Sequence, residues 1–276
     1  MPGAVCRGPI INSALGTFFM DIRVKSWIEL QEAVFAESFR ERIQRFRSPF
    51  VFRGVPRVTH TLDTSLQTGG FVAHEKHLLT SFRKYAVERA VHGDWVWNWL
   101  SLAKHHGLPT RLLDWSYSPH VAMHFATFNL SEFDHDGAIW CVDYQKTNEL
   151  LPPPLREILK IENANIFTTE MLNRVATSLD DFDSLGGDFV VFFEPPSLDE
   201  RIVNQFALFS LPSSPRMSLE ELLKRRESVS RRIIIPAELK WEVRDKLDQA
   251  NITERVLFPG LDGLSQWLKR YFTTRK

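Results

Sequence analysis

The chain has 276 residues, of which 43% are hydrophobic and 25% are charged, values typical of a soluble globular protein with one large domain or two small ones. Lys plus Arg and Asp plus Glu balance at 34 each, which excludes a global electrostatic field that recruits nucleic acid or membrane, so such binding needs a local patch. The two cysteines, Cys6 and Cys141, cannot build a disulfide framework. We therefore expect a reducing, cytoplasmic location.

The apolar runs are shorter than the roughly 20 residues that a membrane-spanning helix needs. Residues 10–20 are mildly apolar but lack the basic flank of a signal peptide, which is therefore not favoured. Met20 is as plausible a natural start as Met1. We expect residues 1–21 to be a poorly ordered N-terminal extension and residues 22–272 to form a single α/β domain.

The first predicted elements are one or two amphipathic helices with apolar positions at Trp27, Leu30, Val34 and Ile43, and Ser26 is a suitable N-cap. A short strand is predicted at residues 50–53. It ends at Gly54, which permits a turn or the close approach of a ligand. Helical spacing of apolar residues then returns over residues 78–89.

A further helix is predicted with Asp94 as its N-cap and with Trp97 directed away from the core. Its expected apolar stripe consists of Trp95, Trp99, Leu102 and His106. Gly107 and Pro109 end it in the usual C-terminal order, with the glycine in a left-handed conformation.

The remaining pattern alternates helices and strands. Ser118 and Pro119 begin a helix, and residues 152–154 are expected to be extended because they are three consecutive prolines. Strands are predicted at residues 137–142, 189–193, 206–210 and 232–235, followed by two closing helices. The basic run from Lys224 to Arg232 is interleaved with glutamates and indicates a solvated helix end.

The densest polar segment is residues 108–116, between two predicted helices. Arg111 and Asp114 lie there beside apolar residues, and buried charges need partners. We therefore expect these two side chains to pair and to hold a rigid loop that presents a hydroxyl at a binding or catalytic site.

Several blocks of the sequence resemble the FRG domain family, named after a motif like Phe52-Arg53-Gly54. The most specific block is residues 104–116, and the helix at 118–126 continues it. Further similar blocks lie at residues 201–209, where the family usually has glycine near Ala207, at 233–236 and at 257–264. The resemblance extends over roughly residues 22–272.

A weaker resemblance is to ADP-ribosyltransferases. Their order of motifs matches Arg53 at the end of one strand, Ser116 before a helix that contains residues 122–126, and Gln205 near a late strand. This resemblance implies an α+β fold with a split, mostly antiparallel sheet and helical additions. It also implies NAD as cofactor, transfer of ADP-ribose to a protein or nucleic-acid acceptor, and a role in bacterial stress or phage defence.

The same resemblance suggests roles for individual residues. Arg53, next to Gly54, would bind the pyrophosphate, for which arginine is a fork-shaped partner. Ser116 and His105 would position the nicotinamide ribose, and Gln205 with Glu200 would face the ribose or the acceptor. The remaining expected binding residues are Thr110, Arg111, Asp114 and Trp115. A glutamine cannot act as a carboxylate, so Glu200, Glu194 and Asp114 are the candidate sources of negative charge.

Other readings of these residues stay open. Gln205 in place of an acid favours a non-catalytic, nucleotide-binding sensor, and the polar residues of the central motif are equally consistent with structural roles. A nucleic-acid hydrolase would need a metal or an acid pair that the sequence does not clearly show. No metal site is expected, because His120 and His124 have the spacing of zinc ligands but lack the glutamate that follows the first histidine of a zinc protease.

Overall fold

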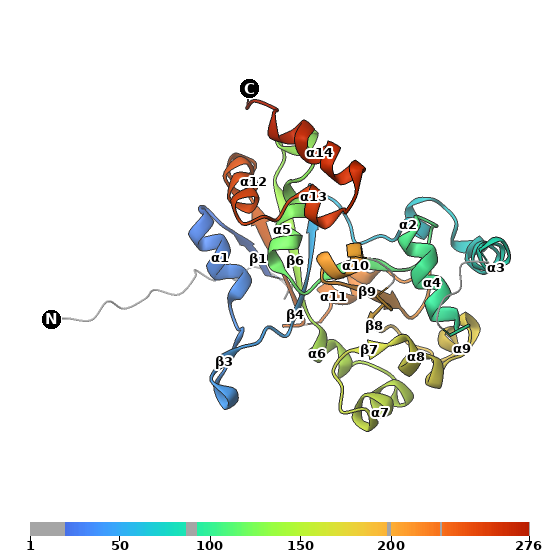
Figure 1. Cartoon of the computed structure of the whole chain (residues 1–276). Coiled ribbons are helices and arrows are strands. Elements are labelled where there is room, and N and C mark those ends of the chain that lie inside the picture. The colour runs from blue at the N-terminus through green and yellow to red at the C-terminus, as the bar shows by residue number, and fades with distance from the viewer. Residues whose placement is uncertain (1–19, 87–92, 198–199, 227, 276) are drawn as a thin grey trace.

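A computed structural model describes residues 20–86, 93–197, 200–226 and 228–275. Within these residues the centre is an eight-stranded sheet with strand order β1-β10-β6-β4-β5-β9-β8-β7 (Figure 1). The two outermost pairs, β1–β10 and β8–β7, are parallel and the inner pairs are antiparallel. The expected α+β class with a mostly antiparallel sheet is therefore confirmed.

The strands of this sheet are β1 (Met20–Arg23), β4 (Phe50–Val55), β5 (Leu113–Ser116), β6 (Gly137–Asp143), β7 (Phe167–Thr168), β8 (Val190–Glu194), β9 (Ala207–Pro212) and β10 (Ser230–Ile235). A separate hairpin pairs β2 (Phe39–Arg40) with β3 (Arg45–Phe46), so the helical pattern that we expected to reach Ile43 ends with Phe35. Met20 and Asp21, which we assigned to the N-terminal extension, begin β1 and pair with β10. Residues 1–19 lie outside the described residues.

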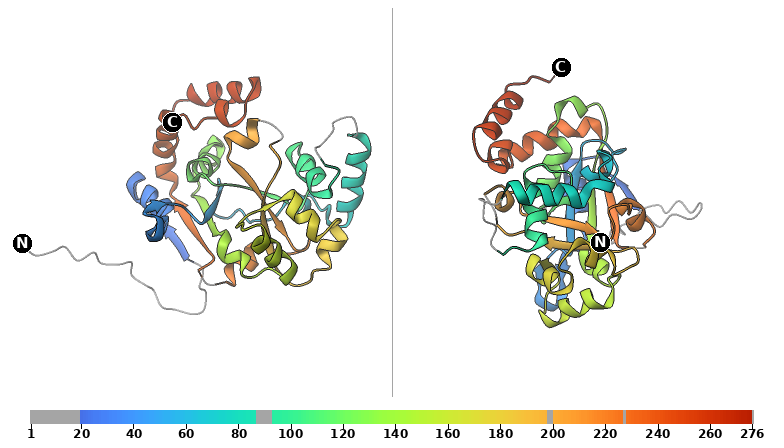
Figure 2. Two further views of the ribbon diagram at one scale, coloured as in Figure 1. Left: turned by 60° about the horizontal axis from the view of Figure 1, so that its bottom comes forward. Right: turned by 90° about the vertical axis from the view of Figure 1, so that its right-hand side faces the viewer.

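The α-helices are α1 (Trp27–Phe35), α2 (Ser65–Thr68), α3 (Glu75–Tyr85), α4 (Val96–His105), α5 (Pro119–Thr127), α6 (Tyr144–Asn148), α7 (Pro153–Ile161), α8 (Thr169–Val175), α9 (Leu179–Asp183), α10 (Glu200–Asn204), α11 (Leu219–Lys224), α12 (Lys240–Gln249), α13 (Glu254–Leu257) and α14 (Leu261–Tyr271). They surround the sheet (Figure 2). No helix in the described part of the chain has the length and apolar character needed to cross a membrane.

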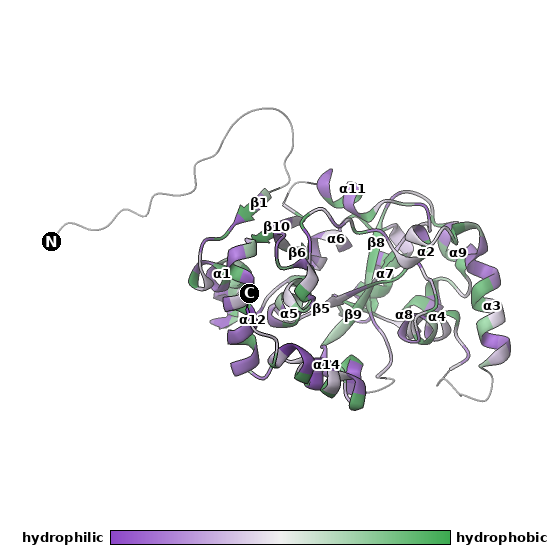
Figure 3. Ribbon diagram, turned by 90° about the horizontal axis from the view of Figure 1, so that it is seen from above, coloured by the Kyte–Doolittle hydropathy of each residue, from purple (hydrophilic) through white to green (hydrophobic). Residues whose placement is uncertain are grey.

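Both faces of the sheet are buried, because alternate residues of each strand belong to different cores. Phe50 and Phe52 pack with α1, α5 and α12, whereas Val51 and Val55 pack on the opposite face with α11. A third core joins β8 and β9 to α3, α4, α7, α8 and α9. Strands β8 and β9 are accordingly hydrophobic in Figure 3.

The sheet divides between β4 and β5. These strands pair at a single position, Phe52 opposite Ser116, whereas β4 and β6 are in register over six residue pairs, from Phe50–Asp143 to Val55–Ala138. Beyond Phe52 the two strands diverge. The side chains of Arg53 and Asp114 therefore lie on either side of a split in the middle of the sheet.

The prediction for α4 is partly wrong. Trp97 is fully buried and donates from Nε1 to the carbonyl of Ala176 at 2.8 Å, whereas Trp95 is only half-buried and His106 is exposed. A single apolar stripe is a poor guide here because α4 is buried on most sides, with residues 97–103 all inaccessible. Asp94 lies before the N-cap and accepts hydrogen bonds from Trp99 and Arg83.

The three prolines also differ from expectation. Pro153 and Pro154 occupy the first turn of α7 instead of an extended segment. Proline is tolerated there because the first N–H groups of a helix have no intrahelical acceptor. The buried residues Leu155, Ile158 and Leu159 supply the apolar face that stabilises this helix.

Other helix ends agree with the sequence. The hydroxyls of Ser26 and Ser118 accept backbone N–H groups at the starts of α1 and α5. Gly107 follows α4 with φ of +82°, and Leu108 N–H donates to the carbonyl of Ala103 at 2.9 Å, as in a left-handed helix C-terminus. Of the helix expected at residues 78–89, positions 87–89 lie outside the described residues.

Helix α5 is tied to the C-terminal helices by buried polar contacts. His124 on α5 is fully buried, and its Nδ1 lies 2.8 Å from Arg244 on α12. Arg270 on α14 binds Asp248 and Glu254 through both ends of its guanidinium. Burial, together with the charges of Arg244 and Arg270, holds the pKa of His124 well below its ordinary value of 6.5.

This burial predicts a pH dependence of stability. Below pH 6.5 the unfolded chain takes up a proton at His124 that the folded protein does not, so the free energy of unfolding falls as the pH falls. Urea denaturation between about pH 5 and pH 8 should show this slope. In His124→Gln, which still accepts a hydrogen bond but does not titrate, the slope should be smaller. An identical slope in both proteins would contradict the assignment.

Substitution by alanine should lower the stability of the protein slightly at one glycine and severely at another. Gly107→Ala should lower the free energy of unfolding by about 1 kcal/mol, because its φ is left-handed but nothing lies within 4 Å of an added Cβ. Gly54→Ala should be far more damaging, because its Cβ would lie 1.8 Å from the carbonyl oxygen of Ala122 on α5. Equilibrium urea denaturation measures both. A neutral Gly107→Ala would argue against the strained turn.

Candidate functional site

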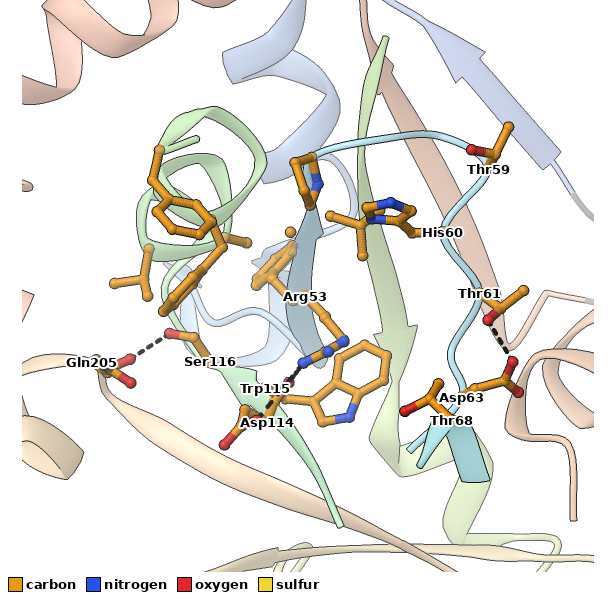
Figure 4. A pocket seen from close by; sticks show the side chains of 18 of the residues that line it. Arg53, Thr59, His60, Thr61, Asp63, Thr68, Asp114, Trp115, Ser116 and Gln205 are labelled. Atoms are coloured by element: carbon orange, nitrogen blue, oxygen red, sulfur yellow. Dashed lines mark hydrogen bonds and ion pairs between the residues drawn. The ribbon is translucent and has the colours of Figure 1, made fainter. Parts of the chain in front are cut away.

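A cavity of about 610 Å³ opens where the sheet divides. Figure 4 shows Arg53 between two walls, with Ser116 and Gln205 on one side and the segment that follows β4 on the other. The lining residues with polar or charged side chains are Arg53, Thr59, His60, Thr61, Asp63, Thr68, Asp114, Ser116, Arg201 and Gln205. The apolar lining comes mainly from β4, Trp115 and α5.

Arg53 is held across the split. Its Nη1 donates to the backbone carbonyl of Asp114 at 2.7 Å and lies 4.0 Å from the Asp114 carboxylate. Its Nε is buried and has no hydrogen-bond partner in the described residues. A buried donor without a partner is costly in a native structure. The side chain as a whole is 25% exposed and lines the cavity, so a ligand there can contact the guanidinium group.

Gly54 lines the cavity next to Arg53, but there is no free space for a side chain at this position. The backbone of Ala122 occupies the place of a side chain. Because Gly54 has no side chain, α5 can pack directly on β4. This contact places the apolar face of α5 at the cavity. Gly54 therefore has a structural role in addition to the expected one of allowing a ligand to approach closely.

Asp114 is the carboxylate nearest to Arg53. It pairs with Lys104 at 2.9 Å, and about half of its side chain is exposed. Burial by the surrounding protein would raise the pKa of Asp114, but the charges of Lys104, Arg53 and Arg201 outweigh that effect and lower it. The carboxylate is therefore ionised at neutral pH and lies among three cations.

The hydroxyl of Ser116 holds the end of β5 to Gln205, two residues before β9 begins. Ser116 Oγ donates to the backbone carbonyl of Gln205 at 2.7 Å and accepts from Ser118 N–H at 2.9 Å. The Gln205 amide donates to the carbonyl of Leu257 at 2.9 Å. Both residues line the cavity, and the Ser116 hydroxyl and the side-chain NH2 of Gln205 already have protein partners. Their arrangement fits positioning of the wall more than direct chemistry.

The apolar wall on the α5 side consists of Val121, Ala122 and Phe125 from the helix, Phe128 directly after it, and Trp115. The Trp115 indole is fixed by a 2.9 Å hydrogen bond from Nε1 to Ser210 Oγ. Two phenylalanine rings beside an arginine form a surface that suits a flat, aromatic ligand with a negatively charged group.

The opposite wall was missed by the sequence analysis. It follows β4 directly and contributes Thr59, His60, Thr61 and Asp63, with Thr68 from α2. Thr61 Oγ1 donates to Asp63 at 2.6 Å. The density of threonines just after the Phe-Arg-Gly motif is a signal that points to these residues.

The expected pairing of Arg111 with Asp114 is wrong. Arg111 is completely buried and binds Glu75 at 2.8 and 2.5 Å and Asp183 at 2.5 Å. Its pKa is raised because the bonds to these two carboxylates outweigh the opposing effect of burial. Residues 113–116 form a strand and not a loop. Neighbouring side chains in such an extended segment point to opposite sides, which separates positions 111 and 114.

Three further predicted site residues lie away from the cavity lining. Thr110 is buried, and its hydroxyl accepts the N–H of Leu112. His105 is half-buried near the end of α4, and Glu200 is exposed at the start of α10. Their assignment to the site came from sequence proximity, whereas Arg53, Gly54, Asp114, Trp115, Ser116 and Gln205 are brought together as expected.

The histidines on α5 have other partners. His120 Nε2 lies 3.0 Å from Gln31 Oε1, and His124 contacts Arg244. Over the ranges that the structure describes, no group of three or more His, Cys, Asp or Glu side chains is arranged to hold a metal ion.

Comparison with known proteins identifies one relationship. The family model described as the FRG domain matches residues 48–135. This segment contains β4, the threonine-rich wall, β5 and α5, and so most of the cavity, whereas Arg201 and Gln205 lie outside it. No curated protein and no solved structure matches the chain.

The contacts of Arg111 predict a structural role. Arg111→Ala should lower the free energy of unfolding by about 3–5 kcal/mol, because it leaves two carboxylates without their cation. Asp114→Ala should have a small effect, because that side chain is half exposed. Urea denaturation of the double variant should give the sum of the two changes, since the residues share no ion-pair partner in the described chain. Strong coupling between them would contradict this separation.

Proposed function

The chain carries an FRG domain at residues 48–135, and from its cavity we propose that it binds NAD or a related nucleotide and transfers ADP-ribose to an acceptor. The observation that carries this proposal is Arg53, a cation that lines a cavity with aromatic walls and whose buried Nε has no hydrogen-bond partner in the described residues. A role in bacterial stress or phage defence rests on the family resemblance alone.

The residues of the cavity fit such a ligand. Arg53 and Arg201 supply two guanidinium groups for a pyrophosphate. Arg201 is also oriented by the Phe258 ring, 5.0 Å from its Cζ. Phe125 and Phe128 offer apolar surface to a base or nicotinamide ring. Asp63 and the neighbouring threonines offer partners for ribose hydroxyls, and the volume is within the usual range of small-molecule sites.

Asp114 is the acidic residue best placed to support transfer. NAD supplies a bond between ribose and nicotinamide whose cleavage places positive charge on the ribose, and a carboxylate stabilises that charge. Asp114 is ionised, accessible and part of the lining. Glu200 lies outside the lining, and the Gln205 amide is bound to Leu257. Of the three candidate sources of negative charge, Glu200, Glu194 and Asp114, this proposal therefore uses Asp114, the one that lines the cavity.

A second candidate is a module that binds the nucleotide without turnover. The 2.9 Å ion pair between Asp114 and Lys104 favours it, because a carboxylate already neutralised by a lysine stabilises a developing cation less well. In this case the same cavity acts as a sensor. Ligand binding would then raise the thermal stability of the protein and leave the ligand intact.

Incubation of the purified protein with NAD tests both candidates. Transfer predicts nicotinamide release, measured by chromatography, which Asp114→Asn abolishes while the NAD-induced rise in melting temperature remains. A sensor predicts the thermal shift without release. Neither a shift nor release, with any acceptor supplied, would overturn the proposal.

Arg53 should be essential for binding in either case. Arg53→Ala should lose the NAD-induced thermal shift, yet lower the stability of the free protein by only about 1 kcal/mol, the contribution of one hydrogen bond. Arg53→Lys should bind weakly, because a point charge replaces a planar fork. Arg225→Ala, which removes an exposed arginine outside the lining, is the matched control. Unchanged NAD binding by Arg53→Ala would contradict the assignment.

A further inference from the structure

The hairpin of β2 and β3 carries a local excess of positive charge, although the chain as a whole has no net charge. Residues 39–47 read Phe-Arg-Glu-Arg-Ile-Gln-Arg-Phe-Arg and contain four arginines against one glutamate, whereas the full chain is neutral. We call residues 39–47 the arginine hairpin. In Figure 1 it lies beyond α1, outside the central sheet. The basic run at 224–232 was the only local charge cluster that we predicted from the sequence.

The two basic segments differ in how their charges are compensated. In the run at 224–232, Lys224 and Arg225 pair with glutamates one turn earlier on α11. Arg231 and Arg232 likewise pair with Glu37 and Asp21. The arginines of the hairpin instead donate to backbone carbonyls or to no group, and they form no salt bridge in the described part of the chain, although the charge of Arg40 also acts on the Asp143 carboxyl.

The register of the hairpin places like charges together. Arg40 lies directly opposite Arg45, and Phe39 lies directly opposite Phe46. Like charges at facing positions destabilise an antiparallel pair, and a hairpin of this size is only marginally stable by itself. An anion that bridges Arg40 and Arg45 would relieve this repulsion.

The aromatic pair is unusually exposed. Phe39 and Phe46 are 45% and 67% accessible, and their rings meet edge to face with centroids 5.1 Å apart. Exposed rings beside uncompensated arginines are the combination that binds single-stranded nucleic acid, because bases stack on the rings while guanidinium groups contact phosphates.

We propose that the arginine hairpin is a binding site for single-stranded nucleic acid. Alternation along the strands directs the Phe39–Phe46 pair to one face and the Arg40–Arg45 pair to the other. A flexible single strand can contact both faces of a narrow hairpin, whereas a flat membrane surface meets one of them. Paired duplex bases do not offer the stacking surface that the rings require. This site is separate from the nucleotide cavity and does not depend on its proposed function.

The test is fluorescence anisotropy with labelled single-stranded oligonucleotides, poly(U) and poly(dT), of about 16 nucleotides. The wild-type protein should bind both, with an affinity that falls steeply between about 50 and 200 mM salt. The double variant Arg42→Ala/Arg45→Ala should bind about tenfold more weakly or worse at the lower salt concentration, and its salt slope should decrease by about 1.4, or 0.7 for each lost phosphate contact. Phe39→Ala and Phe46→Ala should each cost about fivefold or more.

The matched control is Arg225→Ala/Arg226→Ala, which removes two exposed arginines from the other basic run. It should bind like the wild type. Arg42 and Arg45 make no hydrogen bond through their side chains in the described residues, so their removal should leave the fold, checked by circular dichroism, intact. If the phenylalanine variants disturb the hairpin, the Arg42→Ala/Arg45→Ala variant still tests the proposal.

Three results would overturn the proposal. The first is the absence of oligonucleotide binding by the wild-type protein at the lower salt concentration. The second is an equal loss of binding in the control and in the hairpin variant. The third is hairpin-dependent cosedimentation with phosphatidylserine vesicles without oligonucleotide binding, which would assign the surface to membranes instead.

Discussion

The divergence of β4 from β5 is the constraint on which the rest of this structure depends. Each strand is held firmly on its outer side, β4 by β6 and β5 by β9, while the two share one register position. Backbone groups in the split cannot pair with each other. The Arg53 guanidinium bridges part of the gap by binding the carbonyl of Asp114, and the cavity occupies the remainder.

Buried ion networks keep both sides of this split in place. On one side, Arg111 joins the start of β5 to α3 and α9 through Glu75 and Asp183. On the other, Arg270 joins α14 to α12 and α13 through Asp248 and Glu254. Removal of one partner from such a network leaves an uncompensated buried charge. The networks therefore fix the positions of the helices around the cavity without entering it.

The positive charges of the cavity affect ligand binding and the Asp114 carboxylate in different ways. Its positive groups, Arg53 and Arg201, suit a phosphate-bearing ligand, and its aromatic wall suits a planar ring. The same positive groups, with Lys104, surround Asp114 and keep it ionised. In the proposed transfer of ADP-ribose, an ionised carboxylate would stabilise the positive charge that develops on the ribose, but one already paired with cations is a weaker stabiliser. The relative strength of these effects distinguishes an enzyme from a sensor.

The sequence alone determined the features that depend on local spacing. It predicted the caps at Ser26 and Ser118, the left-handed Gly107 and most strands of the sheet. These follow from backbone conformational preferences and from the alternation of apolar residues, which act over a few positions.

Only the tertiary structure decided the partners of the charged residues. Arg111 and Asp114 are three positions apart and suggested a pair, yet each binds residues that lie elsewhere in the chain or fold, such as Glu75 for Arg111 and Lys104 for Asp114. The burial of Trp97 and the threonine-rich wall of the cavity were decided in the same way. A charge binds whatever opposite charge the packed chain brings within a few ångströms, and sequence separation does not fix that distance.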